Sequence, residues 1–202
     1  MKIDEKTILE SIDYKSYRDL VEKLFKEGKS TGTVQSEELL HYTELNIHRM
    51  NRVEKTTILT EELKGVLRKI DQPQIWLILT EGWCGDAAQT VPIFNSIEKE
   101  FPNIKVRLIL RDEHLALMDK FLTNGGRSIP KVLMLDATSL DLLAHWGPRP
   151  KEASHLIDEL KTAQADLSEI KEKLHFWYAK NRGKAVQAEL VEILESTAEK
   201  SN

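Results

Sequence analysis

The single cysteine, Cys84, is the residue of this chain best suited to nucleophilic chemistry. It lies between the apolar run Ile75–Leu79 and a stretch whose apolar residues recur at three- and four-residue steps. These recurring residues are Ala87, Val91, Phe94 and Ile97. The apolar run is typical of a strand buried on both faces, and the spacing that follows is typical of one face of a helix. Cys84 is therefore expected where a strand passes into a helix. The free N–H groups and partial positive charge of a helix N-terminus favour a thiolate, which predicts a lowered pKa for Cys84.

Asp86 follows the cysteine in the expected first turn of the helix. An acid at this position is stabilised by the helix dipole and can cap an N–H group, and this structural role is the more common one. Its charge would also raise the pKa of Cys84, or its carboxyl group would relay a proton. Asp86 therefore opposes the effect of the helix N-terminus, and the sign of the net pKa shift stays open.

The segment W-C-G-D-A with Pro92 eight residues after the cysteine resembles the active-site turn of the thioredoxin family, whose usual form is W-C-G-P-C. Trp83, Cys84, Gly85 and Pro92 match that pattern. The resemblance implies that Cys84 is the catalytic nucleophile. It also implies that Trp83, Gly85 and Asp86 shape the turn at which the substrate binds.

A second element, Ser128-Ile129-Pro130 followed by the apolar strand K-V-L-M-L, resembles the cis-proline element of the same family. The resemblance implies that Pro130 is cis and that the backbone of Ile129 pairs with bound substrate, as in strand addition. Arg127, just before this element, would support a thiolate or bind a carboxylate such as that of glutathione. A solvated surface charge is the more common role for such an arginine.

Three departures from the family pattern limit the chemistry. Asp86 replaces the proline of the turn, Ala87 replaces the second cysteine, and Ile78 stands where the family has a buried acid. A mixed disulfide on Cys84 would therefore need an external thiol to resolve it. We predict a monothiol thiol–disulfide protein, and whether it is an enzyme, a monothiol disulfide oxidoreductase, stays open. The alternative is a non-catalytic binding module with the same fold, which Ala87 and Ile78 favour.

The order of predicted elements indicates an α/β fold, a thioredoxin-like mixed sheet flanked by helices, with extra N-terminal and C-terminal helices. We expect an N-terminal helical extension (1–57), a thioredoxin-like domain (58–165) and a C-terminal helical arm (166–202) packed on the domain. Strands are predicted at 75–79, 105–111, 131–135 and 140–146. Helices are predicted at 3–28, from 36, and at 60–70, 84–100, 113–122, 151–178 and 184–197.

The composition limits the classes of molecule that the protein is expected to bind. The net charge of −4 argues against nucleic acid, and no apolar run is long enough to cross a membrane. The six histidines show no metal-ligand spacing, so neither metal nor cofactor is expected. The expected substrate is a thiol or disulfide, on a protein or glutathione. One cysteine favours the reducing cytoplasm, and the oligomeric state stays open.

Asn46, Arg49 and Arg52 form a polar face on the helix that begins at residue 36. We favour a solvated face for these residues. Packing of this face against the cysteine turn is the alternative hypothesis.

Overall fold

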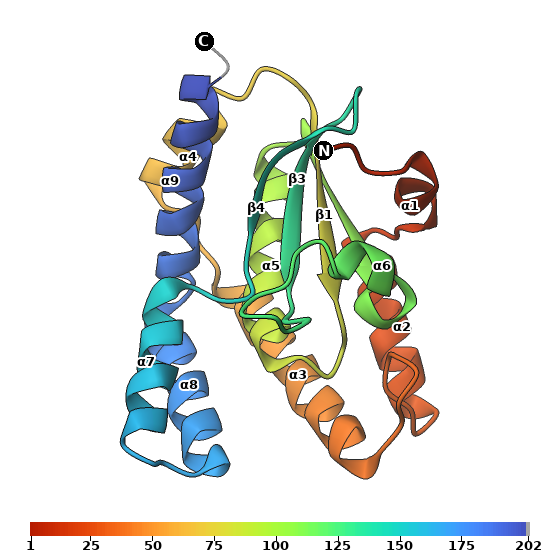
Figure 1. Cartoon of the computed structure of the whole chain (residues 1–202), viewed down its shortest axis with the longest axis vertical. Helices are drawn as coiled ribbons and strands as arrows, with labels where there is room; N and C mark the ends of the chain where they lie inside the picture. The colour runs from red at the N-terminus through yellow and green to blue at the C-terminus, as the bar shows by residue number, and fades with distance from the viewer. Residues whose placement is uncertain (201–202) are drawn as a thin grey trace.

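A four-stranded mixed sheet forms the centre of the computed structural model, which describes residues 1–200 (Figure 1). Its strand order is β2-β1-β3-β4. Strand β1 (Gln74–Thr80) runs parallel to β2 (Ile104–Leu110) and antiparallel to β3 (Lys131–Asp136), and β3 pairs antiparallel with β4 (Leu142–Trp146). Residues Trp76–Thr80 of β1 are all buried, as the apolar run predicts for a central strand. The predicted α/β fold with a mixed sheet is thus confirmed.

The helix α5 (Gly85–Glu100) begins directly after the turn that follows β1, and Pro92 lies within it. It packs against α3 (Glu37–Thr56), whose N-terminus is capped by the Ser36 side chain. The helix α4 (Glu61–Leu67) begins at its cap, Thr60, and packs against α9 (Lys184–Lys200). These contacts fix the N-terminal end of α5 between the sheet and α3.

The predicted helix 3–28 is two helices, α1 (Glu5–Glu10) and α2 (Tyr14–Lys26). Between them, Ile12 exchanges two backbone hydrogen bonds with Leu108 of β2, at 3.0 and 2.8 Å. The spacing of apolar residues continues through this break. The backbone of Ile12, however, forms its hydrogen bonds with the edge strand β2 and not within a helix. The sheet edge therefore overrides the helical pattern.

Two other predicted helices are also interrupted. The segment 113–122 forms a 3-10 turn η1 (Arg111–Glu113) and the single-turn helix α6 (Leu115–Met118). The segment 151–178 forms α7 (Lys151–Thr162) and α8 (Leu167–Asn181), separated where Gln164 adopts a φ of 59°. The Asp166 side chain accepts the N–H of Glu169 and starts α8 anew.

The α7–α8 hairpin has a hydrophobic cluster of its own and lies beside the sheet domain (Figure 1). The cluster consists of Ala153, Ile157, Leu160, Ile170, Leu174 and Tyr178. The main core, in contrast, receives side chains from both ends of the chain, including Tyr17 and Val21 of α2 and Leu190 of α9. The division at residues 57 and 165 stays a prediction, and the terminal helices share the core of the sheet.

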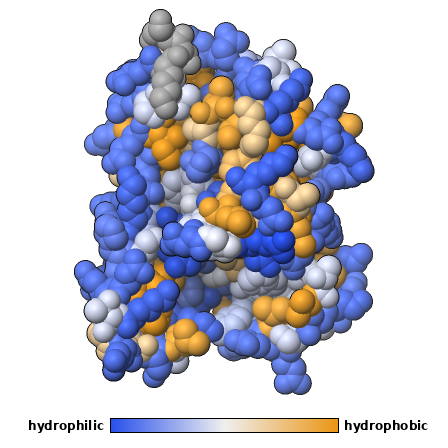
Figure 2. Space-filling model, viewed as in Figure 1, coloured by the Kyte–Doolittle hydropathy of each residue, from blue (hydrophilic) through white to orange (hydrophobic). Residues whose placement is uncertain are grey.

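Polar and charged residues cover most of the face seen in Figure 2, with hydrophobic residues in separate small groups. Among residues 1–200, no helix is both long and apolar enough to span a membrane.

Candidate functional site

Cys84 caps the N-terminus of α5, where its Sγ accepts the N–H of Ala87 at 3.4 Å. The same sulfur donates to the backbone carbonyl of Ile129, 3.2 Å away. Cys84 is buried, with 8% of its surface exposed. The strand-to-helix placement predicted for the cysteine is confirmed, and the thiol lies directly beside the Ile129–Pro130 element.

The pKa of Cys84 is shifted upward, so the predicted lowering is wrong for this structure. Burial raises the pKa of the thiol to about 12, and the charge of Asp86 acts in the same direction. The N–H groups of Ala87 and Asp86 and the charge of Arg149 lower the pKa but are outweighed. The N-terminus of α5 is covered, so the loss of hydration exceeds what its N–H groups supply.

The Ile129–Pro130 peptide bond is cis, as the resemblance implies. The Gly147–Pro148 bond, where the chain leaves β4, is also cis. Gly147 has a φ of 111°, and a Cβ at this position would collide with the carbonyl of Pro130. Glycine is therefore required for the two proline segments to lie against each other beside the thiol.

Asp86 is buried and is the centre of a network on one side of the turn. Its carboxylate accepts hydrogen bonds from Arg149, at 3.0 and 2.6 Å, and from the Tyr178 hydroxyl, at 2.7 Å. Burial raises the pKa of Asp86, whereas Arg149 and Tyr178 lower it. Burial and the nearby Asp86 raise the pKa of Tyr178 well above its usual value. We call this set the Asp86 network, and it attaches α8 to the cysteine turn.

Sequence reasoning missed Arg149 and Tyr178. Arg149 lies in the segment G-P-R-P that follows β4, and Tyr178 lies near the end of α8. The need of a buried acid for a cation became a signal only once the structure showed that Asp86 is buried.

A second network, the α3 network, lies on the other side of the turn. The Asn46 side chain donates to the Gly82 carbonyl at 3.0 Å and accepts from Arg49 at 2.7 Å. Arg52 donates to the Gln89 side chain of α5 at 2.8 Å. Asn46 and Arg49 thus pack against the cysteine turn, as in the less favoured hypothesis, whereas Arg52 is exposed to solvent. The solvated face is wrong for Asn46, which is fully buried.

His175 of α8 completes the α3 network and lies on Gly85. Its Nδ1 is 3.3 Å from the Gln89 amide nitrogen, and a Cβ at residue 85 would be 2.7 Å from its Cε1. Burial lowers the pKa of His175 to about 4, and the charges of Arg49 and Arg52 add to this effect. The absence of a side chain at Gly85 therefore lets His175 of α8 pack directly against the cysteine turn.

The two remaining predicted site residues lie toward the outer side of the turn. Trp83 is half-buried, and the Arg111 guanidinium lies 4.9 Å from the centre of its ring. Arg127 is exposed and forms an ion pair with Asp119 at 2.6 Å. Its charge is thus engaged by a carboxylate, and a role in substrate binding stays a prediction.

A buried acid is present after all, at Glu81, three positions before the cysteine. One of its oxygens accepts the Asp112 N–H at 2.9 Å, and the other has no hydrogen-bond partner within the described chain. Burial raises the pKa of Glu81 to about 7. Sequence reasoning looked for this acid at Ile78 and so overlooked it.

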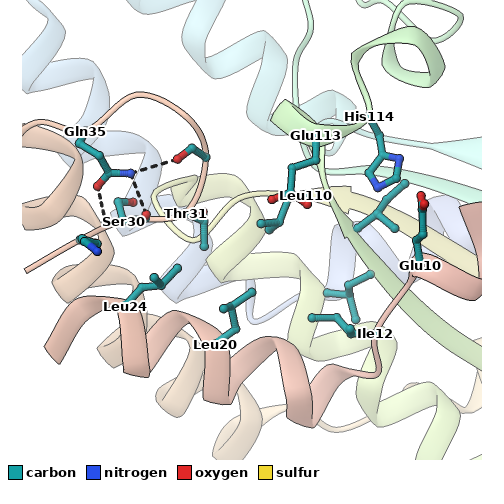
Figure 3. A pocket seen from close by; sticks show the side chains of 14 residues that line it. Glu10, Ile12, Leu20, Leu24, Ser30, Thr31, Gln35, Leu110, Glu113 and His114 are labelled. Carbon is teal, nitrogen blue, oxygen red and sulfur yellow. Dashed lines mark hydrogen bonds between the residues drawn. The ribbon is translucent and has the colours of Figure 1, made fainter. Parts of the chain in front are cut away.

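A separate cavity of about 450 Å³ lies between α2, the loop around Ser30 and β2 (Figure 3). Glu10 and His114 lie at one end, and the Gln35 amide holds the loop at the other through hydrogen bonds to Ser30 and Gly32. None of the predicted site residues lines it. Within residues 1–200, no group of three or more His, Cys, Asp or Glu side chains could hold a metal ion.

Fold and site together define a thioredoxin-like α/β protein with a cysteine-capped helix beside a cis-proline. A family model described as thioredoxin matches residues 32–161, more than half of the chain, and the chain belongs to the thioredoxin family. No curated protein matches it.

Two solved structures share the fold. A protein of unknown function from Pseudomonas aeruginosa is 18% identical with a TM-score of 0.57, over 92% of this chain and 98% of its own. An HIV epitope scaffold is 18% identical with a TM-score of 0.55, over 92% of this chain and 99% of its own. Both similarities cover a larger share of this chain than the family match over residues 32–161.

Proposed function

We propose that this protein is a thiol–disulfide protein that uses Cys84 to form mixed disulfides, which an external thiol resolves. The observation that carries the proposal is the 3.2 Å contact between the Cys84 sulfur and the carbonyl of Ile129, next to the cis bond of Pro130. It joins the one thiol of the chain to the backbone expected to pair with substrate. The single cysteine is consistent with a reducing compartment such as the cytoplasm.

The proposed reaction has two exchange steps. The Cys84 thiol loses its proton to solvent, and its sulfur attacks a disulfide of a protein or of glutathione. A new S–S bond forms, the old one breaks, and the leaving thiolate takes up a proton. An external thiol such as glutathione then loses its proton and attacks the sulfur of the substrate. Cys84 leaves as a thiolate and is protonated again, so the external thiol ends in the new disulfide.

Trp83, Gly85 and Asp86 would shape the turn in this reaction, and Arg127 would lie at its outer edge. A substrate N–H that bonded to the Ile129 carbonyl would take the acceptor that the Cys84 thiol uses here. Substrate binding would then release the thiol from its hydrogen bond. This order of events links binding at Ile129 to the availability of the nucleophile.

A non-catalytic binding module is the second candidate, and the state of the thiol favours it. Burial raises the pKa of Cys84 to about 12, so the thiol is protonated at neutral pH and is a poor nucleophile in this state. The position of the second family cysteine is Ala87, which supplies no resolving thiol. In this candidate function the backbone carbonyl of Ile129 binds a partner without exchange chemistry.

Intact mass measurement after incubation with oxidised glutathione separates the two functions. If Cys84 exchanges disulfides, the protein should gain the mass of one glutathione. Added reduced glutathione should remove this adduct, and the Cys84→Ser variant should not form it. The rate of alkylation by iodoacetamide between neutral and alkaline pH shows whether the thiol is reached. A folded protein that is neither glutathionylated nor alkylated, although its urea-unfolded form is alkylated, would overturn the exchange function in favour of the binding module.

A further inference from the structure

Within the part of the chain that the structure describes, three arginines form no ion pair with a carboxylate, and all three lie in one region. Six of the nine arginines form ion pairs with Asp or Glu. Within residues 1–200, Arg49, Arg52 and Arg182 form none. Arg49 and Arg52 lie on α3, and Arg182 lies at the corner between α8 and α9. In a chain of net charge −4, this is a local concentration of uncompensated positive charge.

Arg52 and Arg182 line the same cavity, which has a volume of about 240 Å³. Its other lining residues are Val53, Thr56, Thr57, Gln89, Tyr178, Ala179 and Gly183. No Asp or Glu is among them. The volume is sufficient for a small anion or for one end of a larger molecule. We call it the arginine cavity.

Neighbouring groups hold the two arginine positions in place. Arg52 donates through one Nη to the buried Gln89 side chain, which leaves its other N–H groups for a ligand. Arg182 has a φ of 54° in the turn between α8 and α9. A Cβ on the following Gly183 would be 2.5 Å from the Ile93 side chain, so this corner is packed closely on the core. The cavity is thus built from positions that packing fixes.

The end of α3 also faces this cavity, and its carbonyl groups would ordinarily repel an anion. The Thr56 hydroxyl donates to the Arg52 carbonyl at 2.9 Å, and the Thr57 hydroxyl donates to the Val53 carbonyl at 2.8 Å. Both carbonyls are therefore partly neutralised. The lowered pKa of His175, to which Arg49 and Arg52 contribute, is a second sign of a positive potential here.

We propose that the arginine cavity binds a phosphate group between Arg52 and Arg182. Two guanidinium groups match the charge of a phosphate dianion, and their planar N–H pairs suit its oxygens. The ligand is a small phosphorylated molecule or free phosphate. The site is independent of chemistry at Cys84, and it shares Tyr178 and Gln89 with the two networks beside the cysteine turn. Bound phosphate stabilises the α8–α9 corner against α3.

Titration of the full-length protein with inorganic phosphate tests the site, with ionic strength held constant by sodium chloride. We expect saturable broadening of the phosphorus NMR signal and a rise in melting temperature. Arg52→Gln and Arg182→Gln are each expected to weaken binding by about tenfold or more. Arg68→Gln, an exposed arginine at the end of α4 that pairs with Glu61 outside the cavity, is the matched control.

Circular dichroism of each variant checks that it is folded, and Cys84→Ser is expected to bind phosphate like the original protein. Non-saturable binding of phosphate, or an equal loss of phosphate binding in Arg68→Gln, would overturn the site and indicate nonspecific attraction of phosphate to positive charge. Equal binding of glutarate at matched concentration would overturn the preference for phosphate. Phosphorylated small molecules that compete with inorganic phosphate would identify the larger ligand.

Discussion

The two networks that flank the cysteine turn differ in how their charges are balanced. In the Asp86 network, a buried carboxylate receives hydrogen bonds from Arg149 and Tyr178, so a negative charge is matched by a positive one. In the α3 network, Arg49 and Arg52 bond only to the neutral side chains of Asn46 and Gln89 within the described chain. The first network holds structure together, and the second leaves positive charge available. The same helix α8 takes part in both, through Tyr178 and His175.

The largest expected effect is that of Asp86→Ala. The Asp86 side chain is 8% exposed and its partner Arg149 is 26% exposed, so the substitution leaves a largely buried cation without its carboxylate. We expect a loss of about 3 kcal/mol in the free energy of unfolding, measured by urea denaturation. Asp119→Ala removes the ion pair with Arg127, whose two side chains are 45% and 46% exposed, and should change the free energy of unfolding little. Similar losses in both variants would show that the Asp86 network does not hold the turn.

The α3 network is tested by the pH dependence of His175→Gln. The pKa of His175 is about 4 in the folded protein against 6.5 ordinarily, so the unfolded chain takes up the proton first as the pH falls. The stability contributed by neutral His175 is present above pH 6.5 and lost between 6.5 and 4. From neutral pH to pH 4, the original protein should lose roughly 1–3 kcal/mol more than the variant.

Urea denaturation at both pH values measures this difference. His48→Gln replaces an exposed histidine on α3 and should follow the original protein at both values. An identical pH dependence of the original protein and His175→Gln would contradict the lowered pKa of His175, which burial and the neighbouring arginines produce.

A smaller effect is expected for Tyr178→Phe, which removes only the hydroxyl that bonds to Asp86. Loss of one hydrogen bond to a charged group should reduce stability by about 1–2 kcal/mol. Hydrogen exchange should show faster opening in α8, whereas α9, which packs on α4 and the main core, should be unaffected. Equal acceleration in both helices would mean that α8 and α9 open as one unit.

The smallest effect concerns the thiol itself. Asp86 raises the pKa of Cys84 and Arg149 lowers it, so Asp86→Asn should lower the thiol pKa and Arg149→Gln should raise it. The midpoint of the alkylation rate against pH measures both changes. A shift in the same direction for the two variants would mean that they act by opening the turn and not through their charges.

Several features were predictable because they depend on local pattern. The buried strand at 75–79, the helix that follows it and the place of Cys84 between them are visible in the spacing of apolar residues. The four strands were found within two residues of their observed ends. The cis-proline element was predictable from Ile129-Pro130 and the strand after it.

Other features depend on partners distant in the sequence. The sequence by itself determined that there is one cysteine, that it lies at the start of a helix, and that Ala87 supplies no second thiol. Only the tertiary structure decided that Arg149 and Tyr178, 63 and 92 residues from Asp86, cover the turn. Burial of the thiol also decided that its pKa is raised, since desolvation depends on what packs against a group. Spacing along the chain describes which groups a helix presents, and packing alone decides whether water reaches them.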